Sequence, residues 1–250
     1  MKLTNKTVII TGVASGIGYE LAIQCLQAGA KVLGVDLPSK VINIIDNNFF
    51  TYYCDLSIEK HIDDLFIKAL ELFKNIDIFI ANAGFAYYEK LDEPSFKHIE
   101  SIYSINTTSP IYSALKMKQI AKNRAFNFVA ISSVMNYWPL PGYSLYSSTK
   151  AALYTFFKGY RHELKKNQHI HIVLPVSTKT NFFIVSGQKH KAWFTQTPKH
   201  VASSIIKGIK HDKKIIYPSK TFKWVYKICP YALNFYVKRE KKLLNKTFKK

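Results

Sequence analysis

Runs of apolar residues, many of them β-branched or aromatic, recur along most of the chain. Six such runs are TVIITG (7–12), KVLGVD (31–36), FFTYYCDL (49–56), IDIFIANAG (76–84), FNFVAISS (126–133) and HIHIVLP (169–175). Two stretches between them, 19–29 and 62–73, place apolar residues at helical spacing. Because the runs do not alternate strictly with polar residues, we expect strands that are buried on both faces. The pattern predicts an α/β fold in three layers, a doubly wound parallel sheet between helices.

Length and cysteine content fit one folded domain in a reducing environment. The 250 residues are 48% hydrophobic, which suits a single large α/β core better than two small ones. Neither a leader-like N-terminus nor an apolar run of about 18 residues is evident, so we expect a cytoplasmic protein. Cys25, Cys54 and Cys229 are far apart and match neither a disulfide framework nor metal-ligand spacing. We therefore expect no metal.

The charge of the chain is concentrated near its C-terminal end. The formal net charge is +20, and residues 207–250 hold 14 Lys and Arg against only Asp212 and Glu240. A basic balance raises the question of nucleic acid. Only three arginines occur, Arg124, Arg161 and Arg239, and no recognition motif is present, so specific nucleic-acid binding is not expected.

A glycine-rich turn follows the first apolar run. TGVASGIG (11–18) contains Gly12, Gly16 and Gly18, and such a turn at a helix N-terminus can accommodate a pyrophosphate. Asp36 ends the second run, where a carboxylate can bind both hydroxyls of an adenosine ribose and would repel a 2′-phosphate. NAD is therefore favoured over NADP. The alternatives are a purely structural glycine turn and an Asp36 that caps a loop.

One of three similar tyrosine–lysine pairs has a serine at a matching position. The spacing Tyr-x-x-x-Lys occurs at Tyr112 with Lys116, Tyr146 with Lys150 and Tyr154 with Lys158. On a helix each pair would be an ordinary surface neighbour, but only Tyr146 has a serine, Ser133, 13 residues earlier at the end of an apolar run. A free phenol has a pKa near 10 and is a poor base at neutral pH. A nearby ammonium group would favour the phenolate, so this pair predicts acid–base chemistry.

The motifs together resemble those of the short-chain dehydrogenase/reductase family. TGVASGIG, CDL (54–56), NAG (82–84), ISS (131–133) and YSSTK (146–150) have the order and spacing found in that family, over roughly residues 5–210. The resemblance implies a Rossmann-type fold, hydride transfer between NAD(H) and an alcohol or ketone, and a homodimer or homotetramer. A noncatalytic NAD-binding scaffold is the alternative, although the four residues of the family's catalytic set are all in register.

The resemblance also assigns roles to individual residues. It implies a catalytic set of Asn106, Ser133, Tyr146 and Lys150, in which Asn106 holds a water of a proton relay and Lys150 also binds the nicotinamide ribose. It implies that Thr11 ties the glycine turn to the region of Asn82. The residues implied to contact the cofactor are Gly12, Ser15, Gly16, Ile17, Gly18, Asp36, Asp55, Leu56, Asn82, Ala83, Gly84, Tyr146, Lys150, Pro175, Thr178 and Thr180. Helix capping is the alternative for both Asn106 and Asp55.

The chain departs from the family after the last apolar run. The usual Pro-Gly-x-x-x-Thr reads Pro175, Val176 and then Thr180 here. A β-branched residue disfavours positive φ, so we expect the backbone to follow a different path at Val176.

Aromatic residues are frequent where the resemblance places the substrate. They are Phe85, Tyr87, Tyr88, Tyr137, Trp138, Tyr143, Phe182, Phe183, Trp193 and Phe194. Such a lining favours a lipophilic secondary alcohol or ketone over a sugar. The alternative is that several of these rings pack in the core or at a subunit interface.

Residues 219–250 form a basic, aromatic extension beyond a dinucleotide-binding domain of residues 1–218. Pro230 should interrupt any helix there, and the apolar segment is too short to span a bilayer. Rings beside lysines suit the surface layer of an anionic membrane, so peripheral membrane contact is one hypothesis. The other is that the rings cover the substrate pocket or a neighbouring subunit while the lysines stay solvated.

Overall fold

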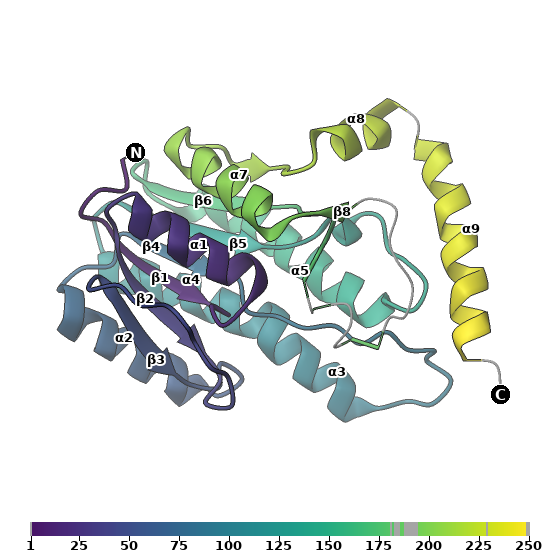
Figure 1. The fold of residues 1–250 in the computed structure, drawn as a ribbon, viewed down its shortest axis with the longest axis horizontal. Coiled ribbons are helices and arrows are strands. Elements are labelled where there is room, and N and C mark those ends of the chain that lie inside the picture. The colour runs from purple at the N-terminus through teal and green to yellow at the C-terminus, as the bar shows by residue number, and fades with distance from the viewer. Residues whose placement is uncertain (1, 181, 183–185, 188–194, 229, 249–250) are drawn as a thin grey trace.

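The computed structural model describes residues 2–180, 182, 186–187, 195–228 and 230–248. Within these residues, seven strands form one sheet in the order β3-β2-β1-β4-β5-β6-β9, and every neighbouring pair is parallel. The chain order reverses between β1 and β4, as in a doubly wound fold. The fold class expected from the sequence is therefore confirmed (Figure 1).

Helices and strands alternate through the first half and then extend into a helical C-terminal segment. In the first half they are β1 (Thr7–Thr11), α1 (Gly16–Gln27), β2 (Lys31–Asp36), β3 (Phe49–Tyr53), α2 (Glu59–Phe73), β4 (Ile78–Ala81), α3 (Phe96–Tyr103), a π-helical turn (Ser104–Thr108) and α4 (Ser109–Ala121). In the second half they are β5 (Phe126–Ile131), a 3-10 turn (Val134–Asn136), α5 (Ser144–Tyr160), a 3-10 turn (Arg161–Glu163), β6 (Gln168–Val173), β7 (Ser177–Thr178), β8 (Thr195–Gln196), α7 (Pro198–Lys210), β9 (Ile215–Ile216), α8 (Lys220–Ile228) and α9 (Pro230–Thr247).

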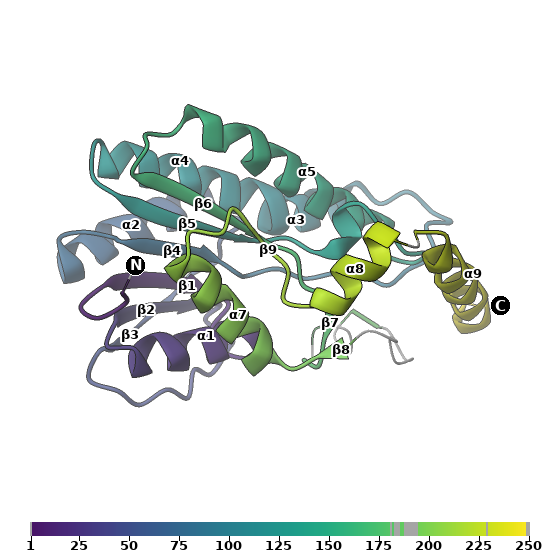
Figure 2. The same cartoon turned by 90° about the horizontal axis from the view of Figure 1, so that it is seen from above.

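Helices cover both faces of the sheet, which explains the apolar runs without strict alternation. Helices α1 and α7 lie on one face, and α2, α4 and α5 lie on the other (Figure 2). Along β1, Ile9 packs into the core beneath α2, α4 and α5, whereas Val8 and Ile10 pack beneath α1 and α7. Both sets of side chains are fully buried, so the three residues between Thr7 and Thr11 are apolar on both faces of the strand.

The strands β1, β2, β4, β5 and β6 all end at the same edge of the sheet. Several apolar runs extend past the end of their strand, and their last residues belong to the loops at this edge. For example, β5 ends at Ile131, and Ser132 and Ser133 follow it. In open α/β sheets ligands bind outside this carboxyl edge, at the point where the strand order reverses.

The C-terminal segment forms two helices that meet at Pro230. Pro230 is the first residue of α9, where its missing N–H costs little, so the expected interruption is present. Phe222 of α8 and Tyr236 of α9 are buried against Trp138, with ring centroids 5.3 and 5.2 Å from that ring. None of the helices in the described part of the chain has the length and apolar character that crossing a bilayer requires.

Candidate active site

Tyr146, Lys150 and Ser133 come together where β5 meets α5. Tyr146 and Lys150 lie one turn apart on α5, and both are buried, with 8% and 5% of their surfaces exposed. The Lys150 ammonium donates a 2.9 Å hydrogen bond to the carbonyl of Ile131, the last residue of β5. Its Nζ lies 5.6 Å from the centroid of the Tyr146 ring. The Ser132 hydroxyl donates to the Lys150 carbonyl at 2.9 Å. Both the side chain and the backbone of Lys150 therefore join α5 to the end of β5.

Ser133 faces the phenol from the start of a 3-10 turn. Its backbone is extended, and its Oγ accepts a hydrogen bond from the N–H of Met135 at 3.2 Å. The pKa of Tyr146 is raised to about 12, because the effect of burial exceeds the opposing effect of its hydrogen bond with Ser133. Burial lowers the pKa of Lys150 to about 8. The lowering of the phenol pKa that was expected from the ammonium group is therefore wrong for the protein alone: desolvation has the largest effect and holds the phenol in its protonated form.

Asn106 lies in the π-helical turn between α3 and α4. Its amide nitrogen donates to the Phe85 carbonyl at 2.8 Å and to the Thr149 hydroxyl at 3.2 Å, and its oxygen accepts from the Phe85 N–H at 3.0 Å. A Cβ at Gly84 would stand 2.9 Å from Asn106 Oδ1 and 3.6 Å from Lys150 Nζ, so the amide and the ammonium border the same glycine. These contacts join the loop after β4 to α5. π-Helical turns inside helices occur often at functional sites.

The two other tyrosine–lysine pairs lie away from this edge. Lys116 pairs with Asp63 of α2 at 2.7 Å, and the Tyr112 hydroxyl donates to the same carboxylate at 2.9 Å. On α5, the exposed Lys158 stands 6.0 Å from the ring of Tyr154. Both pairs are the i, i+4 neighbours expected on a helix surface.

The glycine turn after β1 is tightly held by the loop after β4. Gly12 and Gly16 have φ of +73° and +62°, and a Cβ at Gly18 would lie only 1.9 Å from the Gly12 carbonyl oxygen. The Thr11 hydroxyl accepts hydrogen bonds from the N–H groups of Asn82 and Ala83, both at 3.0 Å. The Asn82 amide in turn donates to the carbonyls of Thr11 and Gly12, at 2.9 and 3.1 Å. The contact between Thr11 and the Asn82 region that the resemblance implied is therefore present.

Asp36 connects the end of β2 to this turn. One carboxylate oxygen accepts from the Ala14 N–H at 2.8 Å and the other from the Leu37 N–H at 2.9 Å. Asp36 thus caps the loop, which is the alternative role given for it above, and it also lies beside the glycine turn. Ser15 precedes α1 with an extended backbone, and its side chain makes no capping hydrogen bond. Turn, helix N-terminus and carboxylate together fit the pyrophosphate and ribose of a nicotinamide dinucleotide.

Three further residues implied to contact the cofactor lie in the segments after β3 and after β6. Asp55 accepts hydrogen bonds from the N–H and hydroxyl of Ser57, at 2.9 and 2.8 Å, in the turn before α2. Ile58, and not Asp55, precedes the first turn of α2, so the helix cap proposed as the alternative for Asp55 is wrong. Leu56 is buried beside it. From the opposite side, a methyl of Thr180 would stand 2.9 Å from a Cβ at Gly16, so the segment after β6 reaches the glycine turn.

The backbone at Val176 differs from that of a glycine in the left-handed region. Val176 is buried, and its φ is not positive. Its carbonyl accepts a 3.1 Å hydrogen bond from the Thr178 hydroxyl, and the Pro175 carbonyl accepts one from the Val134 N–H at 3.1 Å. The segment is therefore held against the loop that follows Ser133, without the conformation that only glycine adopts easily.

Aromatic rings from the loops and from the C-terminal helices gather beside Tyr146. Phe182 and Tyr143 meet the Tyr146 ring at centroid distances of 5.6 and 6.3 Å. Tyr226 of α8 lies 4.4 Å from Tyr137, next to the buried cluster formed by Trp138, Phe222 and Tyr236. Phe183, Trp193 and Phe194, which were also expected to line the substrate site, are outside the described residues.

Sequence reasoning missed the hydroxyls that support the catalytic candidates. Ser132 and Thr149 hold Lys150 and Asn106 by side-chain hydrogen bonds, and the Ser186 hydroxyl lies 3.3 Å from that of Tyr143. Ser132 and Thr149 directly precede Ser133 and Lys150 in the chain. Their position beside catalytic candidates was the available signal.

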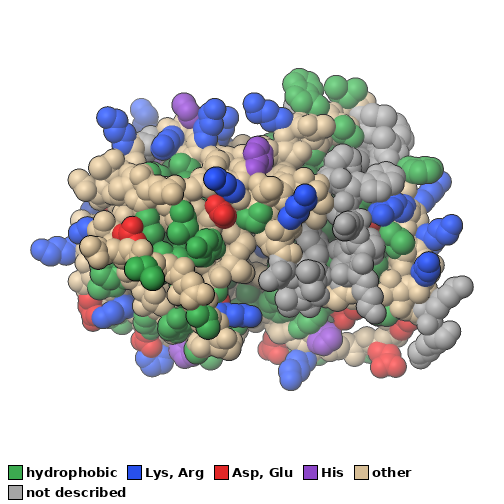
Figure 3. Space-filling model, viewed as in Figure 1, with side chains coloured by type: hydrophobic (Ala, Val, Ile, Leu, Met, Phe, Trp, Pro, Cys, Tyr) green, Lys and Arg blue, Asp and Glu red, His purple; other side chains and the backbone are tan. Residues whose placement is uncertain are grey.

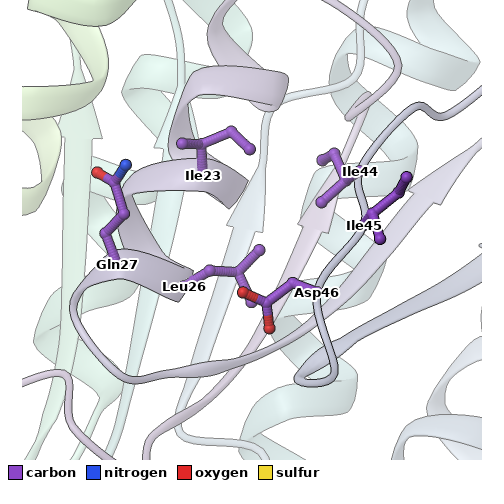
Figure 4. Close-up of a pocket in the computed structure, with 6 residues that line it drawn as sticks. All are labelled: Ile23, Leu26, Gln27, Ile44, Ile45 and Asp46. Atoms are coloured by element: carbon purple, nitrogen blue, oxygen red, sulfur yellow. The ribbon is translucent and has the colours of Figure 1, made fainter.

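A surface hollow elsewhere on the molecule is separate from this site. It lies between the C-terminal part of α1 and the loop before β3, and Figure 4 shows its lining residues, Ile23, Leu26, Gln27, Ile44, Ile45 and Asp46. It is near the amino ends of the strands, whereas the catalytic candidates are at the carboxyl ends. It shares no residue with them, and we assign it no part in the chemistry.

Comparison with known proteins gives consistent matches. A family model described as short chain dehydrogenase matches residues 6–191. The 3-oxoacyl-[acyl-carrier-protein] reductase FabG of Buchnera aphidicola subsp. Schizaphis graminum is 34% identical over 190 residues, which cover 72% of this chain and 77% of the relative. The uncharacterized oxidoreductase DltE of Bacillus subtilis is 31% identical over 172 residues, covering 66% of this chain and 68% of the relative.

Solved structures of the same kind superpose closely. A short chain dehydrogenase/reductase from Burkholderia phymatum in complex with NAD has a TM-score of 0.83 at 16% identity, covering 94% of this chain and 96% of that one. A short-chain dehydrogenase from Sphingobium yanoikuyae in complex with NADPH has a TM-score of 0.78 at 22% identity, covering 91% and 93%. At these identities the likeness shows the fold, and the cofactors belong to those two proteins.

Proposed function

This chain belongs to the short-chain dehydrogenase family of oxidoreductases, and on that premise we propose that it transfers a hydride between NAD(H) and a lipophilic secondary alcohol or ketone. The observation that carries the proposal is the convergence of Tyr146, Lys150, Ser133 and Asn106 at the carboxyl edge of the sheet. The glycine turn that fits a dinucleotide ends at the same edge.

In this mechanism Tyr146 moves the proton and its neighbours position the reacting oxygen. Ser133 donates a hydrogen bond to the substrate oxygen, and the Tyr146 hydroxyl donates its proton to that oxygen during reduction or accepts it during oxidation. The raised pKa keeps the phenol protonated, which is the form that carbonyl reduction requires. Lys150 supplies positive charge beside the phenol, and Asn106 fixes the loop after β4 against α5. The nicotinamide supplies or accepts the hydride when bound.

The preference for NAD over NADP rests on Asp36. Its carboxylate stands at the end of β2, beside the glycine turn, where it suits ribose hydroxyls and repels a 2′-phosphate. No Lys or Arg occurs at Val13, Ala14, Ser15 or Leu37 to offset that repulsion.

The lipophilic substrate class is supported by the rings around Tyr146. Phe182 and Tyr143 contact the catalytic ring, and Trp138 belongs to the loop that leads from Ser133 to Tyr146. Because α8 and α9 pack their buried rings against Trp138, the C-terminal segment supports one wall of this region.

Assembly into a homodimer or homotetramer is a further proposal, which rests on family membership and is tested by light scattering.

The decisive experiment compares two tyrosines on the same helix. Oxidation or reduction of NAD(H) is followed by its absorbance with a panel of steroid, long-chain, acyl-type and polyol substrates. Tyr146→Phe should lower kcat by on the order of 10²–10⁴, whereas the matched control Tyr154→Phe should stay within about twofold of the unmodified protein. Equal activity of Tyr146→Phe and Tyr154→Phe would refute the mechanism. Tight NADH binding without turnover of any substrate would favour a noncatalytic scaffold, and a clear preference for polyols would refute the lipophilic class.

A further inference from the structure

Helix α8 has one face buried against the protein and one face exposed. Phe222 is fully buried, whereas Trp224 and Ile228 expose 62% and 74% of their surfaces. Lys220, Trp224 and Ile228 follow each other at i, i+4 spacing, so they form a single exposed stripe. A tryptophan and an isoleucine therefore stand beside a lysine on the outer face.

Helix α9 repeats this arrangement with more positive charge. Tyr236, Glu240 and Leu244, spaced four residues apart, are all buried. Phe235 exposes 71% of its surface and shares the opposite face with the exposed Lys238 and Lys242, at i+3 and i+7. The exposed Lys241 and Lys246 lie on neighbouring positions of the same helix.

The outer surface of both helices carries one sign of charge. Glu240 is the only acidic residue between 219 and 250, and it is buried and paired with Arg239 at 2.6 Å. All other charged side chains that the structure describes in α8 and α9 are lysines. In Figure 3 hydrophobic side chains stand out over α8, and Lys and Arg side chains lie along the edge formed by α9.

From this arrangement we propose that the outer face of α8 and α9, formed by Trp224, Ile228, Phe235, Lys238, Lys241 and Lys242, binds the surface of an anionic membrane. Rings and aliphatic side chains enter the headgroup layer while lysines attract anionic lipid. A second copy of the chain fits this face poorly, because a symmetric contact would bring together two faces that both carry only positive charge. A nucleic acid would use the lysines and leave the exposed apolar side chains without a role. The buried face of the same helices contacts Trp138, so the lipid-binding face and the active-site edge lie on opposite sides of one layer.

The test is cosedimentation of the full chain with phosphatidylcholine vesicles, with and without phosphatidylglycerol. The unmodified protein should bind only the anionic vesicles at low salt. Lys238→Gln/Lys241→Gln/Lys242→Gln should lower the partition coefficient about 100-fold, because each lysine near an anionic surface contributes about fivefold. The matched control Lys31→Gln/Lys40→Gln/Lys166→Gln, which removes the same charge from exposed positions elsewhere, should lower it about twofold at most.

The apolar half of the face needs its own pair of variants. Trp224→Ser/Phe235→Ser should lower the partition coefficient about tenfold, and Phe96→Ser, at a phenylalanine that is 80% exposed on α3, should leave it unchanged. Equal binding to both vesicle types would overturn the proposal. An equal loss of binding in the two triple lysine variants, the one in α9 and the control, would also overturn it. A loss with the tail lysines but none with Trp224→Ser/Phe235→Ser would indicate general polyanion binding instead of lipid. Light scattering decides against a lipid face if Trp224→Ser/Phe235→Ser dissociates an oligomer.

Discussion

Replacing Gly18 by alanine tests the close approach that shapes the cofactor turn. A Cβ at Gly18 would lie 1.9 Å from the Gly12 carbonyl oxygen and 2.7 Å from Asn82 Nδ2. The nearest atom belongs to the backbone, so it cannot rotate away, and either α1 or the turn has to move. Overpacking of a tight site costs about 1–3 kcal/mol, and we expect the upper end, about 3 kcal/mol of unfolding free energy. The displaced turn should also weaken NADH binding about tenfold, or about 1.4 kcal/mol.

Gly159→Ala is the matched control for this prediction. Gly159 lies near the end of α5, and a Cβ there would meet nothing within 4 Å. Since alanine is the better helix former, this variant should gain about 0.5 kcal/mol and bind NADH normally. Urea denaturation followed by circular dichroism gives the stabilities, and NADH fluorescence gives the affinities. If the two variants unfolded at the same urea concentration, the close contact between Gly18 and Gly12 would be refuted. A normal NADH affinity with lowered stability would leave that contact standing and count against the cofactor site.

Three further perturbations test the electrostatics and the packing of the same structure. The pKa of Lys150 is about 8 in the fold and 10.5 in its ordinary state, so this group contributes a rise in the free energy of unfolding with pH across that window, against the fall that the raised pKa values of Cys25 and Cys54 contribute. The change in unfolding free energy from neutral pH to pH 10.5, measured by urea titration, should therefore be on the order of 3 kcal/mol lower in Lys150→Met than in the unmodified protein; an equal change in both proteins would show that Lys150 makes no such contribution. Phe222→Ala should lower the free energy of unfolding by about 3–5 kcal/mol, because this ring is fully buried beside Trp138. Trp224→Ala should change it by about 0.5 kcal/mol or less, and similar losses for both variants would contradict the assignment of a buried and an exposed face to α8. Asp36→Ala should lower the ratio of kcat/KM with NAD to kcat/KM with NADP by about tenfold or more, because the carboxylate no longer repels the 2′-phosphate. An unchanged ratio would exclude Asp36 as the source of the preference for NAD.

Local pattern was enough to predict six of the seven strands of the sheet, and only the two-residue β9 was missed. A strand buried on both faces favours apolar residues along its whole length, and a run such as IFIA of β4 is typical of such a strand. The ends of the elements were less well predicted. Helix α2 begins at Glu59, three residues before the apolar pattern, because polar residues of its first turn face solvent and add nothing to the periodicity.

The order of motifs likewise predicted that the catalytic candidates lie at one edge of the sheet. Parallel strands end together, so Ser133 after β5 and the turn after β1 had to share that edge, and α5 places Tyr146 and Lys150 one turn apart. The protonation of the pair was beyond the sequence. It depends on how completely the two groups are buried, and desolvation is the largest effect on both pKa values.

For the C-terminal extension, the sequence alone did not predict which side chains are buried. The sequence determined that residues 219–250 are basic and aromatic and that Pro230 divides them, since these properties are local. It left two roles open for the rings, because spacing shows which residues share a helix face but not what that face meets. Only the tertiary structure decided that Phe222 and Tyr236 turn inward against Trp138, while Trp224 and Phe235 remain in contact with solvent. The physical reason is that burial depends on contacts between residues about 80–100 positions apart, which a local pattern does not encode.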